Sequence, residues 1–385
     1  MLISKLLLPR SLRLRHRGSP DALLAVSIAI LVAFGFLMLA SASSNLGVRL
    51  EGDAYFFLKG QLFKGLSVGI VFFLLAYFTD YRIFKKLSVP LLVISIILLG
   101  LVIFTPLGET QKGATRWLNL GFFTMQPSEV IKFTFIVYLA SWLSGAAAAR
   151  RRKNLTEGIL PFLIVAGIIS FLILRQPATS VIVIIMFSAL VVYFMSGARL
   201  NYIVGLILLG ALVLSLYIAV TPYRRERVIS YFRSTDSESQ VDILGSKYHL
   251  NQARITIGSG GLWGVGFGQS LTKTKYLPEP MGDSIFAVVA EEFGFIGAIA
   301  VILLFFIIVL RGFLLARRQN DEFARLVLIG FSSLIGIQTF VHIASISGVI
   351  PFTGIPLPFI SYGSTALVVF LSIAGLMLNL SRRSV

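Results

Sequence analysis

The chain has 385 residues, of which 56% are hydrophobic and only 13% are charged. Together with a mean hydropathy of +0.88, this composition excludes a soluble globular domain and indicates a polytopic membrane protein. The net charge of +17 does not point to a nucleic-acid partner, because basic residues in so apolar a chain mark cytoplasmic loops. The chain contains no cysteine, which excludes disulfides and thiolate metal sites.

Apolar stretches along the chain are long enough, at about twenty residues each, to cross a bilayer as helices. They lie at about 22–43, 61–79, 87–105, 128–145, 158–175, 179–196, 202–220, 284–310, 326–346 and 363–380. The sequence therefore predicts an all-α polytopic membrane protein with about ten transmembrane helices. Residues 1–385 form a single integral membrane domain in this prediction, with a large loop, 221–283, between the seventh and eighth helices.

Lysine and arginine residues gather in alternate connections between these spans. The basic positions are Lys5, Arg10, Arg13, Arg15, Arg17, Arg82, Lys85, Lys86, Arg150, Arg151, Arg152, Lys153, Arg199, Arg311, Arg317, Arg318, Arg325, Arg382 and Arg383. The positive-inside rule therefore places both termini in the cytoplasm, with residues 1–20 as a cytoplasmic segment. Loop 221–283 is then extracytoplasmic, as are the connections at about 106–127 and 347–362.

The first part of the long loop is basic and aromatic, and it is expected to form an interfacial helix. Its arginines lie on the side where the positive-inside bias disfavours charge: Arg224, Arg225, Arg227 and Arg233. Guanidinium groups match phosphate oxygens in geometry and charge. Arg224 and Arg227 are therefore candidate ligands of an anionic headgroup, and a solvated charged face is the alternative.

Glycines are concentrated in the stretch Gly258-Ser-Gly-Gly-Leu-Trp-Gly-Val-Gly-Phe-Gly268. This stretch is not a nucleotide-binding motif, because the Walker lysine is absent and no GxGxxG spacing fits. Tight turns or a re-entrant segment with close backbone packing explain it better.

Glu129 and Lys132 stand three residues apart at the outer end of the fourth span, so they share one helix face. Charged residues within a span usually pair with one another or line a polar cavity. Arg116 lies on the same outer side, in the preceding connection. The pair is thus either a structural ion pair near the interface or part of a substrate cavity.

Asp283 stands where the long polar loop meets the eighth helix, after the proline-stiffened Pro278-Glu-Pro280. A carboxylate at that boundary can meet a lipid-linked substrate from one side and water from the other. Glu291 and Glu292 follow on the same helix, where cavity contact, helix packing and a lysine partner all remain open. His342 is a lone histidine in the ninth span without other ligands at metal spacing, so we interpret it as a satisfied buried histidine and expect no metal site built by the protein.

Three motifs resemble the signatures of the SEDS family, the peptidoglycan glycosyltransferases that include FtsW, RodA and SpoVE. The motifs are Gln126-Pro-Ser-Glu-Val-Ile-Lys132, Leu277-Pro-Glu-Pro-Met-Gly-Asp283 with Glu291-Glu292, and Pro351-Phe-Thr-Gly-Ile-Pro-Leu-Pro-Phe-Ile-Ser-Tyr-Gly363. The similarity covers almost the whole chain, with the motifs in the same order and at the same topological positions. Leu39-Ala-Ser-Ala-Ser-Ser44 and Met281-Gly282 favour the FtsW type, which acts in cell division, over the RodA type, which acts in elongation.

The resemblance implies a polymerase of lipid II, the undecaprenyl-pyrophosphate-linked disaccharide peptide, in the bacterial cytoplasmic (inner) membrane. It further implies an extracytoplasmic active site, a class B penicillin-binding protein as partner, and other division proteins around it. Asp283 falls on the family's essential loop aspartate, Glu129 and Lys132 on its carboxylate–lysine pair, and Arg116 on the preceding arginine. Glu279 and Ser361, in the second and third motifs, are further candidate substrate-binding residues.

The chain departs from the family pattern at two places. Many members carry an aspartate after the Gln-Pro at the fifth outer boundary, whereas Ala178 follows Gln176-Pro177 here, so no role of that carboxylate applies. The double glycine after Ser-Tyr is Gly363-Ser364 in this chain, a mild change that affects only turn geometry.

The chemistry of glycan polymerisation needs a base for the acceptor hydroxyl, positive charge for the diphosphate leaving group, and a groove for lipids. Asp283 supplies the base, and Arg116, Lys132 and the Arg224–Arg233 group supply the charge. The sequence requires no cofactor, although a divalent cation such as Mg²⁺ or Mn²⁺ could help to neutralise the diphosphate. The rival hypotheses are a precursor flippase or transporter, disfavoured because the polar groups gather at one face instead of the midplane, and a non-catalytic scaffold.

Overall fold

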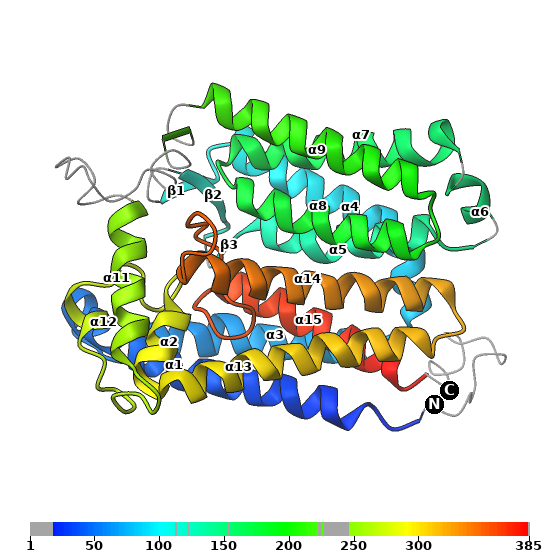
Figure 1. The fold of residues 1–385 in the computed structure, drawn as a ribbon. Helices are drawn as coiled ribbons and strands as arrows, with labels where there is room; N and C mark the ends of the chain where they lie inside the picture. Colours follow the sequence, from blue (N-terminus) through cyan, green and yellow to red (C-terminus); the bar gives the residue numbers. More distant parts are fainter. Residues whose placement is uncertain are drawn as a thin grey trace.

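The structure, a computed structural model, describes residues 18–111, 114–121, 123–145, 147–152, 154–221, 225–226 and 246–383. Long helices run side by side along one axis, and Figure 1 shows the strands, α11 and α12 together at the end opposite the N and C marks. The elements are α1 (Ala22–Glu51), α2 (Phe56–Gly60), η3 (Gln61–Leu66), α3 (Ser67–Phe78), α4 (Tyr81–Phe104), β1 (Gly108–Gln111), β2 (Ala114–Asn119), β3 (Thr124–Met125), α5 (Pro127–Trp142), α6 (Ala148–Arg151), η4 (Leu155–Ile159), α7 (Leu160–Arg175), α8 (Thr179–Met195), α9 (Leu200–Val220), α11 (Ser246–Ser259), α12 (Thr272–Lys275), α13 (Ile285–Arg317), α14 (Glu322–Ile346) and α15 (Ser364–Ser381).

The prediction of a polytopic all-α membrane protein is confirmed. Within the described residues, 8 helices are long and apolar enough to cross a membrane, with α2, η3 and α3 counted as one and η4 and α7 as another. The two remaining predicted spans correspond to the shorter helices α5 and α8. The largest differences are at helix ends, because α1 continues to Glu51 and α13 to Arg317.

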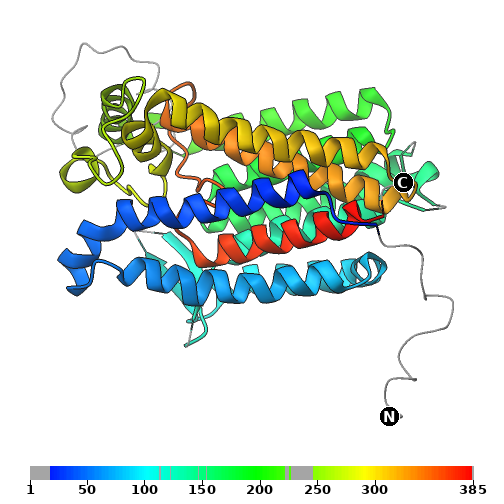
Figure 2. The same ribbon diagram turned by 90° about the horizontal axis from the view of Figure 1, so that it is seen from below.

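The core of the bundle is formed around α14 and α15. In the most apolar window of each of these helices 72% of residues are buried, compared with 11% in α9, which lies at the periphery and presents its side chains to lipid. Close approach between helices depends on small residues, as is usual where no hydrophobic force acts between helices in lipid. A Cβ on Gly375 of α15, for example, would lie 2.4 Å from the Phe73 carbonyl oxygen of α3, and Figure 2 shows these two helices side by side.

The connection before α5 is not the plain loop that we expected. β1 pairs with β2 and β2 with β3, both antiparallel, and the Thr110 and Thr115 hydroxyls lie 2.7 Å apart across the first pair. Strands this short are marginal alone, and their periodicity is too brief to read from sequence. The interfacial helix expected at 224–233 falls mostly outside the described residues, of which only 225–226 belong to that segment.

The glycine-rich stretch packs its backbone closely, as we predicted, and it does so against a kink in α13 that the sequence did not show. Gly294 has a φ of 65°, a left-handed value that interrupts the helix. The amides of Val265 and Gly266 donate to the carbonyls of Glu291 and Glu292 at 2.9 and 3.0 Å. In the opposite direction, the Phe295 amide donates to Gly261 at 2.9 Å. The stretch therefore satisfies backbone groups that the kink removes from the helical pattern.

Asp21 joins three helices at the end of the bundle that carries the termini. Its carboxylate accepts a hydrogen bond from the Leu24 amide at 2.8 Å, which caps α1, and forms an ion pair with Arg311 of α13. Its own amide donates to Ser381 Oγ of α15 at 3.0 Å. Burial raises the pKa of Asp21, but the hydrogen bonds from Arg311 and the Leu24 amide outweigh it, so the pKa lies below its ordinary value.

Replacing Asp21 should lower the thermal stability of the purified protein. Asp21→Ala removes the cap, at about 1 kcal/mol, and the ion pair, whereas Asp21→Asn keeps a capping oxygen and should cost less. Because the folded pKa is depressed, this contribution is present above the unfolded pKa of about 3.9 and disappears as pH falls through the folded pKa. Melting curves at pH 7 and at acid pH measure it, and equal melting points for the parent and the Ala variant at pH 7 would contradict it.

Candidate functional site

Asp283 lies in the loop between α12 and α13, and this loop is hydrogen-bonded to the turn at 351–363. The Tyr362 amide donates to the Met281 carbonyl at 2.8 Å, and Ser361 Oγ donates to the Gly282 carbonyl at 2.7 Å. The Asp283 carboxylate faces the same turn, since a Cβ on Gly354 would lie 3.1 Å from its Oδ2. The second and third sequence motifs therefore meet at Asp283.

Ser361 is buried, and its hydroxyl has a structural task. Its Oγ accepts a hydrogen bond from the Leu357 amide at 2.8 Å while it donates to Gly282. The hydroxyl proton is thus directed at the protein backbone. The geometry makes Ser361 a link between the two motifs, and its role in substrate binding stays a prediction.

His249 of α11 is a residue near Asp283 that the sequence did not single out. Its Nε2 lies 2.6 Å from Ser284 Oγ, and Ser284 uses its one hydroxyl proton to donate to the Pro278 carbonyl at 2.8 Å. Nε2 must therefore carry a proton and act as the donor. The imidazole ring also packs on Phe352, with 4.0 Å between centroids. His249 thus contacts both the loop that carries Asp283, through Ser284, and the 351–363 turn, through Phe352.

Glu129 and Lys132 form an ion pair of 2.7 Å inside the protein, with side chains 2% and 0% exposed. Pro127 begins α5, a position that proline favours, and places Glu129 in the first turn. Lys132 Nζ also donates to Gln338 Oε1 of α14 at 2.9 Å, and Gln338 Nε2 donates to the Pro356 carbonyl at 2.9 Å. The predicted pairing is confirmed, and it is connected through Gln338 to the turn that holds Asp283.

His342 makes the second attachment of this turn to α14. Its Nδ1 donates to the Ile355 carbonyl at 2.6 Å, so the histidine is buried as we expected, but within the described residues only this ring nitrogen is satisfied. Glu129 Oε2 and His342 Nε2 are buried and form no hydrogen bond with the described part of the chain.

Arg116 of β2 is bound to the connection between α7 and α8. Its Nε and Nη2 donate to the carbonyls of Gln176 and Pro177 at 3.0 and 2.7 Å. Ala178 follows directly, and these acceptors of the guanidinium are backbone oxygens. These contacts fix the small sheet to the bundle.

Glu292 has the lysine partner that the sequence left open. Its Oε1 lies 2.6 Å from Lys273 Nζ and accepts from Ser41 Oγ at 2.6 Å, and both charged side chains are buried. Glu291 accepts from Ser270 and Thr272 in the same connection. The two glutamates thus fasten the segment before Asp283 to α13 and α1.

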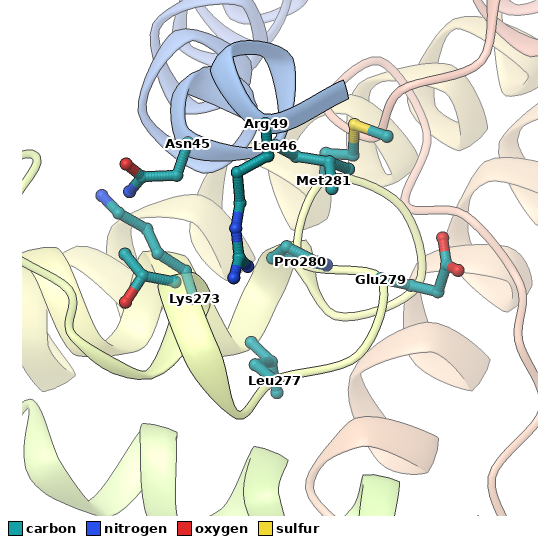
Figure 3. A pocket seen from close by; sticks show the side chains of 9 residues that line it. Asn45, Leu46, Arg49, Lys273, Leu277, Glu279, Pro280 and Met281 are labelled. Carbon is teal, nitrogen blue, oxygen red and sulfur yellow. The ribbon is translucent and has the colours of Figure 1, made fainter. Parts of the chain in front are cut away.

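A cavity of about 250 Å³ opens between the end of α1, α12 and the loop that leads to Asp283. Figure 3 shows Arg49 and Lys273 on one side, while the Glu279 carboxylate points away on the far side of the loop. The cavity is lined by Asn45, Leu46, Arg49, Lys273, Thr274, Leu277, Glu279, Pro280 and Met281. Glu279 has a left-handed φ of 48°, a strained value for a non-glycine residue, at the sharpest bend of this loop.

Two candidate residues, Arg224 and Arg227, lie outside the described residues, so their proposed contact with an anionic headgroup stays a prediction. Among the residues that the structure describes, no group of three or more histidine, aspartate or glutamate side chains could hold a metal ion.

A bundle of apolar helices with a buried ion pair below a carboxylate-bearing loop defines a multi-pass membrane protein whose polar site lies at one end of the bundle. The comparison with known families makes this specific. The chain belongs to the FtsW/RodA/SpoVE family, because the family model described as "Cell cycle protein" matches residues 21–385.

Relatives of similar length support this membership. The chain is 36% identical over 372 residues to Stage V sporulation protein E of Bacillus subtilis, covering 96% of this chain and 98% of the relative. It is 35% identical over 361 residues to the probable peptidoglycan glycosyltransferase FtsW of Trichlorobacter lovleyi, covering 94% and 93%.

Solved structures share the fold. A chain from a peptidoglycan synthase complex that coordinates polymerization and crosslinking superposes with a TM-score of 0.75 at 30% identity, covering 95% of this chain and 98% of that one. The rod shape determining protein RodA of Thermus thermophilus gives a TM-score of 0.68 at 28% identity, covering 95% and 97%.

Removing one partner of the buried pair should strongly destabilise the protein. Glu129→Ala or Lys132→Ala leaves one charge unpaired in the bundle, a loss of about 3–5 kcal/mol, whereas replacing both residues by apolar ones should cost less. Lys59→Ala is the matched control, because Lys59 and Asp53 are also 2.7 Å apart but largely exposed, and exposed pairs contribute about 0–1 kcal/mol. Thermal unfolding in detergent measures all four variants, and equal losses for Lys132→Ala and Lys59→Ala would refute the prediction.

Replacement of His249 should affect catalysis more than stability. His249→Leu removes the donor to Ser284 and loosens the loop beside Asp283, so we expect a lower turnover with little change in folding. His249→Gln can still donate from its amide and should retain more activity. Initial rates of glycosyl transfer by the two purified variants distinguish the outcomes. A Leu variant as active as the parent would exclude this positioning role.

Proposed function

We propose that the chain is a peptidoglycan glycosyltransferase that polymerises lipid II, with Asp283 as the general base. One observation carries the proposal: a carboxylate is held at the end of a membrane bundle by hydrogen bonds from the 351–363 turn to the Met281 and Gly282 carbonyls beside it. The names of the relatives, which include peptidoglycan glycosyltransferases, support the same reaction class. One relative is named for sporulation and the family model is described as a cell cycle protein, and we propose the division-type role for this chain.

In the proposed reaction the acceptor sugar hydroxyl attacks the anomeric carbon of the donor, and the lipid diphosphate leaves. Asp283 takes the hydroxyl proton as the new glycosidic bond forms. A single displacement of this kind inverts the anomeric carbon and needs one carboxylate base, unlike hydrolysis by a carboxylate pair. Proximity matters as much as basicity, and the hydrogen-bonded turn limits how far the carboxylate can move.

The cationic residues divide into two groups in this proposal. Lys132 and Arg116 are bonded to protein acceptors, so we assign them the positioning of the turn and the small sheet. Arg224 and Arg227, together with Arg49 at the cavity of Figure 3, are proposed to face the diphosphate. No step depends on a divalent cation, although Mg²⁺ or Mn²⁺ carried by the diphosphate could share this task.

The proposed setting is the bacterial cytoplasmic membrane, with both termini in the cytoplasm and Asp283 on the outer side. The basic residues of the connections support this orientation. A class B penicillin-binding protein is the proposed partner, and the similarity to a chain of a peptidoglycan synthase complex supports a partner of that kind.

Asp283→Asn should reduce polymerisation while the protein still folds. The amide is nearly isosteric but cannot take a proton, and general-base assistance is worth about 10²–10⁴-fold, or roughly 3–5 kcal/mol of barrier. Asp283→Glu should also be impaired because its carboxylate is displaced by one methylene. Initial-rate polymerisation of labelled lipid II by the purified variants, with the partner present, is the measurement.

Asp53→Asn is the control for this experiment, since Asp53 is an exposed carboxylate that follows α1 and pairs with Lys59. Its rate should equal that of the parent. An Asp283→Asn rate within a few-fold of the parent would show that Asp283 is not the base.

A further inference from the structure

The depth of the glycine-rich stretch in the membrane follows from α13. Residues 293–310 of this helix contain no charged side chain and are bounded by Glu292 and Arg311. At 1.5 Å per residue they extend about 27 Å, close to the ~30 Å thickness of the hydrocarbon core. Glu292 therefore lies at the outer end of the uncharged part of α13.

The stretch is hydrogen-bonded to α13 at this boundary. Its amides reach the carbonyls of residues 291 and 292, and its carbonyls accept from residues 295 and 296. The loop thus lies level with the junction of headgroups and acyl chains instead of projecting into water. Non-helical backbone is tolerated at this depth where its polar groups are satisfied, and these bonds satisfy the amides of Val265 and Gly266 and the carbonyls of Gly261 and Leu262.

The side chains of this loop are apolar and face outward. Trp263 is 80% exposed and Leu271 78%, with Leu262 and Phe267 also exposed. The carbonyls of Gly261 and Leu262 accept from the amides of Phe295 and Ile296. An exposed apolar face of α13 begins at these two residues and continues through Ile299, Ile302 and Phe306. A soluble surface would not carry such a patch, whereas tryptophan is enriched where a membrane protein meets the headgroups.

We propose that the segment 262–271 is a membrane anchor, inserted into the outer headgroup boundary with Trp263 and Leu271 in contact with lipid. The proposed occupant of this surface is lipid, because the patch adjoins the exposed apolar side of α13, a helix long and apolar enough to cross a membrane. A protein partner on this face is the alternative that the experiment distinguishes.

The anchor fixes the depth of the loop that carries Asp283. Two residues after Leu271, Lys273 is held by Glu292 and Ser41, and the chain then continues directly through Leu277 to Asp283. A lipid-linked substrate carries its diphosphate at the headgroup level. Anchoring the loop there keeps the carboxylate at a constant height relative to that group.

The test uses the fluorescence of Trp263 in the full-length chain. The sequence has 3 tryptophans, so Trp117→Phe with Trp142→Phe leaves Trp263 as the single emitter. The protein is placed in nanodiscs of phosphatidylcholine that is either unmodified or brominated on the acyl carbons near the headgroup. We expect bromine to quench most of the emission, and aqueous iodide to quench little.

A control places the probe on an exposed polar residue outside the segment 262–271. Asp53 is an exposed carboxylate that follows α1 and pairs with Lys59, so Asp53→Trp, with all three natural tryptophans replaced by Phe, should be quenched by iodide and not by bromine. If the variant with Trp117→Phe and Trp142→Phe does not purify, the difference in quenching between the parent and Trp263→Phe gives the quenching of the Trp263 emission.

Trp263 emission that is unchanged by bromine would overturn the anchor. With strong iodide quenching the loop would be in water, and with weak iodide quenching it would be covered by protein. Neither result depends on enzymatic activity. The fluorescence can therefore reject the anchor while the proposed function stands, and the activity assays can reject the proposed function while the anchor stands.

Discussion

The arrangement of the outer site depends on a buried charge inside the bundle. An ammonium group within a membrane protein is costly unless it is paired, and Lys132 satisfies this need with Glu129 and with Gln338. Once its oxygen is held by Lys132, the Gln338 amide is oriented toward the Pro356 carbonyl. The buried ammonium group needs polar partners in a low-dielectric interior. One of these partners, Gln338, also holds the turn through the Pro356 carbonyl. Ser361 and Tyr362 of that turn then fix the loop of Asp283.

A second buried pair fastens the same loop from the side. Lys273 and Glu292 join α12 to α13, with Ser41 of α1 bonded to both. The kink at Gly294 lies just beyond, and the glycine-rich stretch takes over the backbone hydrogen bonds that the kink interrupts. A side chain at Gly264 or Gly294 would prevent this packing, because the two backbones approach too closely for a Cβ at either position. Asp283 is thus held between two charge-dependent attachments.

The sequence predicted the spans, because apolar length is a direct consequence of bilayer thickness. It also predicted the Glu129–Lys132 pair, since both residues lie on one helical turn. It could not predict Gln338 as the third member, because that contact joins residues 206 positions apart. His249 escaped for the same reason: its partner Ser284 is 35 residues away, and a lone histidine in a polar loop carries no periodic signal. The three strands before α5 were missed because they are too short to show alternation.

The central claim is that the buried pair holds the Asp283 loop through Gln338 and the turn. Hydrogen exchange of the Gln338→Leu variant in nanodiscs tests it most directly, because this change removes the link without touching Asp283. The account predicts faster exchange at the amides of Leu357, Tyr362 and Ser284, with the interior of α5 still protected. Unchanged exchange at these three amides would show that the turn and the loop hold each other without the buried charge, and would contradict the account.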